Sequence, residues 1–214
     1  CDYVVPAIQP HGNLDAYVYL IDRHSFSATG GAHDTNVPIV VNDVAPVVSA
    51  VTLNSGSDIT LTEGTTTAVS VSATVSDDNS CQDLTSVTTS VYRSGVTFAS
   101  CDTNPEDDNN SCYAVITCSV SGGTCTGSTD GSADYTCSVS LQYHADPTDV
   151  NTEYPAQDWL ATVVGTDGSQ SANTELGTGV EVLSLIGYDV TGTINYGSLT
   201  VGQSNDPLDR TTNV

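Results

Sequence analysis

Basic side chains are nearly absent from the sequence: there is no lysine, and the only arginines are Arg23, Arg93 and Arg210. Against 26 acidic residues they leave a formal net charge of −23. A sequence-independent grip on nucleic acid needs clustered Lys and Arg, so this charge excludes nucleic acid as a partner and disfavours anionic membrane surfaces. Cations are the small partners that it favours. The alternative interpretation is that the charge serves solubility alone.

Long apolar runs and catalytic motifs are also absent. No stretch is apolar and long enough to span a membrane, so we expect no direct membrane insertion by this segment. No signal peptide is visible, and we expect an export signal and any anchor to lie outside these residues. No G-x-S-x-G, H-E-x-x-H or P-loop pattern occurs, and the histidines are scattered at His11, His24, His33 and His144. We therefore predict no catalytic residues and no enzyme activity.

Cysteine, in contrast, is abundant. Seven cysteines occur, with no CxxC pair and no zinc-like Cys/His spacing: Cys1, Cys81, Cys101, Cys112, Cys118, Cys125 and Cys137. They predict disulfides, and therefore an extracellular or cell-surface location. Cys118 and Cys125 flank a Ser/Gly turn and Cys101 and Cys112 bracket an acidic loop, which predicts two local bridges and leaves Cys81 with Cys137. Cys1 is the odd cysteine, unpaired in this fragment, and we expect its partner elsewhere.

Apolar and polar side chains alternate in the pattern of β-strands. Residues 69–75 and 135–143 alternate strictly, the period of a strand with one buried face. Further strand-like runs, separated by Asn, Asp, Gly and Ser turns, cover residues 47–53, 59–61, 86–92, 113–120, 159–164 and 180–185. About seven to nine short strands at this spacing predict an all-β fold, an immunoglobulin-like antiparallel β-sandwich.

A weak internal repeat places the domain boundaries. Residues 17–29 and 161–173 share an apolar strand, an Asp at its end, a Ser-rich turn and another strand. Both are typical of the last hairpin of a sandwich. We therefore predict partial β units at both ends of one whole domain: the C-terminal part of a preceding domain (1–43), a linker (44–46), a complete disulfide-rich domain (47–185) and the start of a following unit or an exchanged strand (186–214).

Four runs of sequence resemble a known class of modules. They are VAPVVSAVTL at 44–53, VSDDNSC at 75–81, VYRSG at 91–95 and WLATVVGTD at 159–167. They look like the repeated immunoglobulin-like modules of large bacterial cell-surface proteins, over roughly the middle two thirds of the chain. The resemblance implies tandem modules on a cell exterior, and it implies no enzyme.

Acidic side chains gather at two predicted strand ends. Four polar residues follow one strand and a fifth ends a strand near it in a sandwich: Asp77, Asp78, Asn79, Asp83 and Asp167. Ca²⁺ takes about six to eight oxygen ligands of these kinds, so this pole is the candidate metal site and Ca²⁺ the candidate cofactor. The alternative is that Asp and Asn only cap turns. Asp146 and Asp149 form a second, weaker acidic group.

These features predict a structural role. We expect a non-enzymatic extracellular module of a surface layer, stalk or filament, which associates with itself or with neighbouring modules of the same polypeptide, with strand exchange by residues 188–195 as one route. The alternative is an adhesin or carbohydrate-binding module whose calcium-supported loops hold a glycan or another cell-surface ligand. An accessory domain of a secreted hydrolase is a third interpretation.

Aromatic residues bear on the choice between these roles. A carbohydrate platform needs several aromatic side chains exposed on one face, for which Tyr3, Tyr17 and Tyr19 are the candidates. Trp159, Tyr135 and Tyr143 are instead predicted to pack in the core of the sandwich. We favour core packing for the aromatic residues in general, and therefore the structural role.

Overall fold

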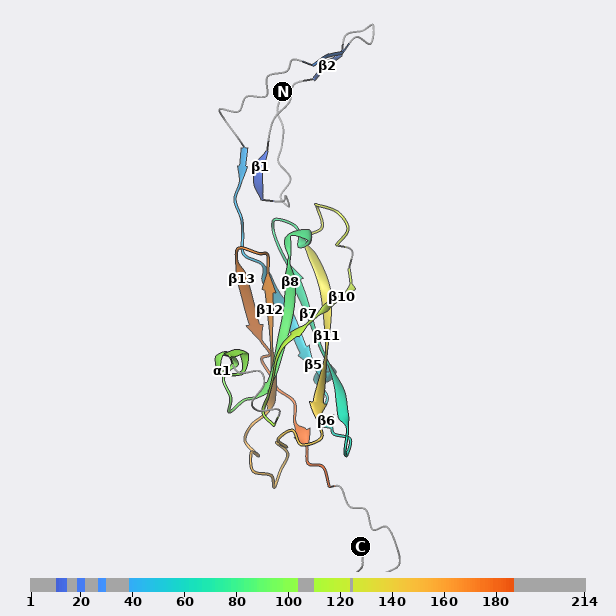
Figure 1. Cartoon of the computed structure of the whole chain (residues 1–214), viewed down its shortest axis with the longest axis vertical. Coiled ribbons are helices and arrows are strands. Elements are labelled where there is room, and N and C mark those ends of the chain that lie inside the picture. Colours follow the sequence, from blue (N-terminus) through green and yellow to red (C-terminus); the bar gives the residue numbers. More distant parts are fainter. Residues whose placement is uncertain are drawn as a thin grey trace, which may run out of the picture.

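Two β-sheets, packed face to face, form the body of the protein (Figure 1). The computed structural model describes residues 11–14, 19–21, 27–29, 39–103, 110–123 and 125–186. One sheet has the strand order β10-β11-β7-β5 and the other β13-β12-β8-β9, with every pairing antiparallel. Their strands are β5 (Val47–Leu53), β7 (Thr66–Ser76), β8 (Ser86–Arg93), β9 (Cys112–Thr117), β10 (Ser119–Gly122), β11 (Ser132–Gln142), β12 (Trp159–Thr166) and β13 (Ser171–Glu175).

The strand order is that of an immunoglobulin-like sandwich. In the usual lettering β5, β7, β11 and β10 take positions A, B, E and D of one sheet, while β8, β12 and β13 take positions C, F and G of the other. β9 adds a fourth strand to the second sheet, beside β8. The predicted all-β sandwich is confirmed.

Shorter elements flank the two sheets. β14 (Val182–Leu183) pairs in parallel with β6 (Ile59–Thr60), while β1 (Gly12–Leu14) pairs with β4 (Ile39–Val41) and β2 (Tyr19–Ile21) with β3 (Ser27–Thr29). The helical turns are η1 (Asn54–Gly56), η2 (Cys81–Asp83) and α1 (Phe98–Thr103). Cys1, Tyr3, Tyr17 and the strands predicted within 188–201 lie outside the described residues.

The alternating strands face the core as predicted. On β7 the odd positions Val69, Val71, Ala73 and Val75 are buried, and on β11 Tyr135, Cys137, Val139 and Leu141 are buried. Trp159 is 0% exposed, and its indole Nε1 donates a hydrogen bond to the carbonyl of Asp146 at 2.9 Å, so its polar atom has a partner inside the core. The prediction for Tyr143 was wrong: it follows the end of β11 and is exposed.

The run predicted as one strand at 113–120 is two strands in opposite sheets. β9 pairs with β8, and after a single residue, Cys118, β10 pairs with β11. The N–H of Cys118 still donates to the carbonyl of Val87, near the start of β8, at 2.9 Å. The chain thus passes from one sheet to the other at Cys118, and the continuous β-type composition on both sides of this residue does not reveal the change.

Three disulfides join the six described cysteines, and two differ from the predicted pairing. Cys101–Cys112 is confirmed, but Cys118 bonds to Cys137 and Cys81 to Cys125. The reason is strand register: Ser119 pairs with Thr136, so the preceding Cys118 lies opposite Cys137. Cys125 then lies in the loop beside η2, and Cys81 is its partner. The turn between Cys118 and Cys125 belongs to a longer hairpin, and its ends are not closed on each other.

The disulfide between the sheets should be the one that most supports the crossing. Replacing Cys118 and Cys137 together with Ala is expected to lower the free energy of unfolding by roughly 3 kcal/mol, because the two cysteines, 19 residues apart, close a loop in the unfolded chain. Urea unfolding of the oxidised protein measures this loss. In a non-reduced digest, a fragment that links Cys81 directly to Cys137 would contradict the observed pairing.

Candidate functional site

Two loops of the sandwich and the chain before β5 converge at one end, here called the acidic pole and defined by His11, Asp43, Asp77, Asp83 and Asp167. Antiparallel pairing explains the convergence, because the start of β5 lies beside the end of β7, with Val47 opposite Ser76. The loop after β7 also meets the end of β12, where Thr85 N–H donates to the Thr166 carbonyl at 2.8 Å. Residues far apart in sequence are thereby gathered at one pole.

Asp77 and Asp167 shape their own turns with one carboxylate oxygen each. Asp77 Oδ1 accepts a hydrogen bond from Asn79 N–H at 2.7 Å, and Asp167 Oδ1 accepts from Ser169 N–H at 2.8 Å and Gln170 N–H at 2.6 Å. Asp commonly forms such side-chain-to-backbone hydrogen bonds in the turn that follows a strand. The second oxygen of each carboxylate, Oδ2, is buried and accepts no hydrogen bond. Because Asp77 is 2% and Asp167 4% exposed, solvent hardly reaches either group.

Asp43, in the chain that enters β5, adds a third buried oxygen without a hydrogen bond. Its Oδ2 accepts hydrogen bonds from Gln170 Nε2 at 3.0 Å and from Ser169 Oγ, which attach it to the β12–β13 turn. Its Oδ1 is buried and accepts no hydrogen bond. Buried carboxylate oxygens usually have a partner, so three such atoms at one pole require a physical explanation.

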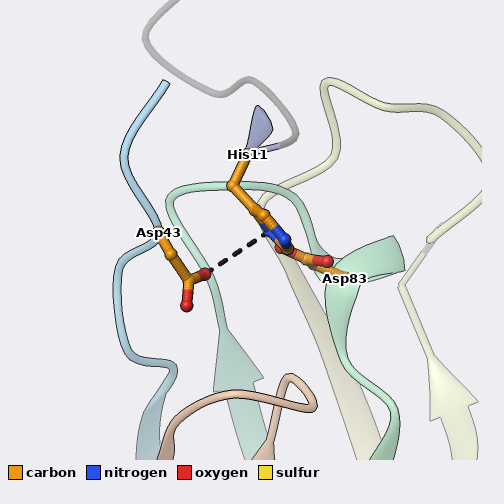
Figure 2. Close-up of side chains that lie close together, drawn as sticks. All are labelled: His11, Asp43 and Asp83. Atoms are coloured by element: carbon orange, nitrogen blue, oxygen red, sulfur yellow. Dashed lines mark hydrogen bonds and ion pairs between the residues drawn. The ribbon is translucent and has the colours of Figure 1, made fainter. Parts of the chain in front are cut away.

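His11 is the one cationic side chain described at the acidic pole (Figure 2). Its Nδ1 lies 2.5 Å from Asp83 Oδ2 and 3.4 Å from Asp43 Oδ1. The hydrogen bond to Asp83 and the charge of Asp83 raise the pKa of His11 above its usual value of 6.5. His11, Asp43 and Asp83 bring ligand-type atoms within 4.8 Å of one another, and within the described residues they are the group whose spacing fits a metal ion.

Negative charge at the acidic pole exceeds the positive charge that the described residues supply to balance it. Burial raises the pKa of Asp77, and the neighbouring charges of Asp83, Asp167 and Asp43 raise it further. The hydrogen bonds from Ser169 and Gln170 lower the pKa of Asp43, which keeps this carboxylate ionised. Arg93 is the sole Lys or Arg in the described part of the chain, and it lies at the far end of β8, paired with Asp146 at 3.0 Å.

Asn79 and the disulfide of η2 hold the acidic loop against its neighbours. The Asn79 side chain accepts from Val44 N–H at 2.7 Å and donates to the Asn42 carbonyl at 3.0 Å, so it clamps the chain before β5 on both sides of Asp43. On the other side, Cys81 is bonded to Cys125, and its N–H donates to the Asp130 carbonyl at 2.8 Å. Cys81, Asn79 and Asp77 are all buried. The acidic pole is therefore held in place by buried hydrogen bonds and a disulfide, and it is not a solvated loop.

The structure brings together most, but not all, of the residues predicted for a metal. Asp77, Asp83 and Asp167 meet at the acidic pole, and Asn79 supports it, whereas Asp78 is exposed. Sequence reasoning missed Asp43 and His11. The second acidic group is not a cluster, because Asp146 pairs with Arg93 while Asp149 accepts from Ser184 N–H at 3.0 Å and Oγ at 2.9 Å.

Comparisons with known proteins identify no relative. No protein-family model, no curated protein and no solved structure matches the chain. A separate structural finding concerns membranes: in the part of the chain that the structure describes, no helix has the length and apolar character needed to cross one.

Loss of the Asn79 clamp should free the linker at the acidic pole. Asn79→Ala leaves Val44 N–H and the Asn42 carbonyl without this partner, so we expect a loss of about 1 to 3 kcal/mol in the free energy of unfolding and faster hydrogen exchange at the Val44 amide. Hydrogen exchange followed by mass spectrometry measures the second effect. Asn173→Ala, which truncates an exposed Asn on β13, is the matched control. Equal exchange at Val44 in both variants would contradict the clamp.

Proposed function

We propose that this chain is a non-enzymatic extracellular structural module of a surface layer, stalk or filament, and that it works as a spacer between the segments on either side. The observation that carries the proposal is the position of the two connections. The chain enters the sandwich at the acidic pole, where β5 begins, and the last described strand, β14, lies at the opposite pole (Figure 1). A module with its connections at opposite ends sets the distance between its neighbours and transmits force along its long axis.

The strand pairings at the two connections support this role. β6 follows β5 in the chain and pairs in parallel with β14, where Ile59 N–H donates to the Glu181 carbonyl at 2.8 Å. A pull from opposite poles draws two parallel strands past each other, so their hydrogen bonds are loaded together and not one at a time. β5 is loaded in the same sense against β7, with which it forms five paired positions.

Three disulfides also fit a spacer outside the cell. They indicate a non-reducing setting, because thiols are kept reduced in the cytosol. All three lie within 81–137, away from the two connecting strands. They restrict how far the chain can extend if the sandwich unfolds under force, which suits a module exposed to mechanical work.

The edges of the sandwich favour end-to-end association over lateral strand pairing. β5, β9 and β10 are edge strands, and the pairing of each contains a register shift of the β-bulge type. Bulges at sheet edges hinder pairing with another chain. The remaining edge, β13, has only five residues and a polar composition. Strand exchange by residues 188–195 stays a prediction, since this segment lies outside the described residues.

Stretching single molecules by their two ends tests the spacer. We expect a discrete unfolding event in the oxidised protein. In reducing solution the gain in contour length should increase by at least roughly 150 Å, because the segment between Cys81 and Cys125, 44 residues apart, is then released at about 3.5 Å per residue.

A matched control comes from the nested disulfide. Cys101 and Cys112 lie inside the loop that Cys81–Cys125 closes, so replacing both with Ala should leave the contour length of the oxidised protein unchanged. Extension without a discrete unfolding event in the oxidised protein would refute the spacer role.

A further inference from the structure

We propose that the acidic pole is a binding site for a hard divalent cation, with Ca²⁺ as the natural candidate. Asp43 before β5 and Asp83 in η2 have ligand atoms within 4.8 Å of each other. Asp77 after β7 and Asp167 after β12 are buried carboxylates of the same pole. Asp43, Asp77 and Asp167 each have one oxygen that is buried and accepts no hydrogen bond.

Turn formation alone does not explain these oxygens. The capping role of Asp77 and Asp167 is fulfilled by Oδ1, and the attachment of Asp43 to the β12–β13 turn is fulfilled by Oδ2. The remaining oxygen of each group is withdrawn from water at a pole where Asp43, Asp83 and His11 bring ligand atoms within 4.8 Å of one another. Without a cation this arrangement opposes folding, and a bound cation turns the same arrangement into an attraction.

The chemistry of the donors selects the class of cation. Carboxylate oxygens with supporting carbonyls and water suit Ca²⁺, which takes about six to eight oxygen ligands in flexible geometry. His11 is 41% exposed at its side chain, whereas Asp77 and Asp167 are almost fully buried. We therefore assign the first ligand positions to Asp43 and Asp83, whose atoms lie within 4.8 Å of each other, and propose the buried oxygens of Asp77 and Asp167 as further ligands. His11 is then a counter-ion that the cation replaces at Asp83 and Asp43.

A cation at this pole would join the preceding segment to the sandwich. Asp43 lies in the chain between β4 and β5 that Asn79 clamps at Asn42 and Val44, and His11 lies next to β1, which pairs with β4. The site therefore contains atoms from the segment before β5 and from two loops of the sandwich. The binding site stands on its geometry, while its role as a stiffener of the joint rests on the proposed spacer function.

Thermal unfolding of the full chain in Ca²⁺ and in chelator tests the site. With Ca²⁺ at about 100 times its dissociation constant, the melting temperature of the oxidised protein should rise by about 5 to 10 °C. Asp77→Asn and Asp167→Asn keep the side-chain shape and remove one charge, so each should lose most of this rise. In chelator both should melt at or above the wild-type temperature, because a repulsive charge is gone.

Controls separate binding from general charge effects. Glu63→Gln removes one negative charge from an exposed position before β7, at the other pole, and should keep the full Ca²⁺ response. No rise in the wild type at millimolar Ca²⁺, or an equal rise in Asp77→Asn, would overturn the proposal. Stabilisation by Zn²⁺ but not by Ca²⁺, abolished by His11→Ala, would overturn the assignment to a hard cation.

Hydrogen exchange at the Val44 amide tests the joint separately. Ca²⁺ should slow this exchange in the wild type and leave it unchanged in Asp77→Asn. A rise in melting temperature without slower exchange would retain the cation site and remove its role in the joint. The stretching experiment in chelator depends on neither result, so failure of the spacer and failure of the site are distinguishable.

Discussion

Cys118 is the residue at which the two sheets are tied together. Its N–H bonds to β8 in one sheet and its Sγ to Cys137 on β11 in the other, within the single residue that separates β9 from β10. This double attachment fixes the position of β11 relative to the facing sheet. Since β11 pairs with β7 over its whole length, the alignment of β7, and with it the positions of both poles, depends on the same point.

The acidic pole inherits its geometry from that alignment. The carbonyls at 130 and 131, just before β11, accept hydrogen bonds from the N–H groups of Cys81 and Asp77. The chain that leads into β11 therefore supports the loop after β7, here called the acidic loop. The Cys81–Cys125 disulfide holds the loop from the side, and Asn79 then positions the linker. These three attachments hold the acidic loop in place against the repulsion between its own charges, and they keep Asp77 buried.

Sequence patterns predicted the features that follow from period and topology. The alternation of Val69 to Val75 is a local property, and the meeting of Asp77 with Asp167 follows from antiparallel strands that share an end. The predicted disulfide pairing was wrong because it was based on distance along the sequence, whereas strand register determines which cysteines meet. Cys118 lies opposite Cys137 because Ser119 pairs with Thr136. Asp43 could have been found, since a strand start shares a pole with the end of its neighbour. His11 could not, because its approach depends on the pairing of β1 with β4, which no pattern in the sequence indicated.

The distribution of positive charge separates the two poles chemically. At the far pole Arg93 is 11% exposed at its side chain and engages Asp146, Gln157 and the ring of Tyr154, whose centroid lies 3.6 Å from its guanidinium carbon. These partners all belong to its own sandwich, and the Arg93 side chain is too buried to neutralise the acidic pole of a neighbouring module. Within the described residues no other Lys or Arg exists to do so. If modules of this kind are joined end to end, their described residues bring more negative than positive charge to each junction, and a solute cation is one source of the balancing charge.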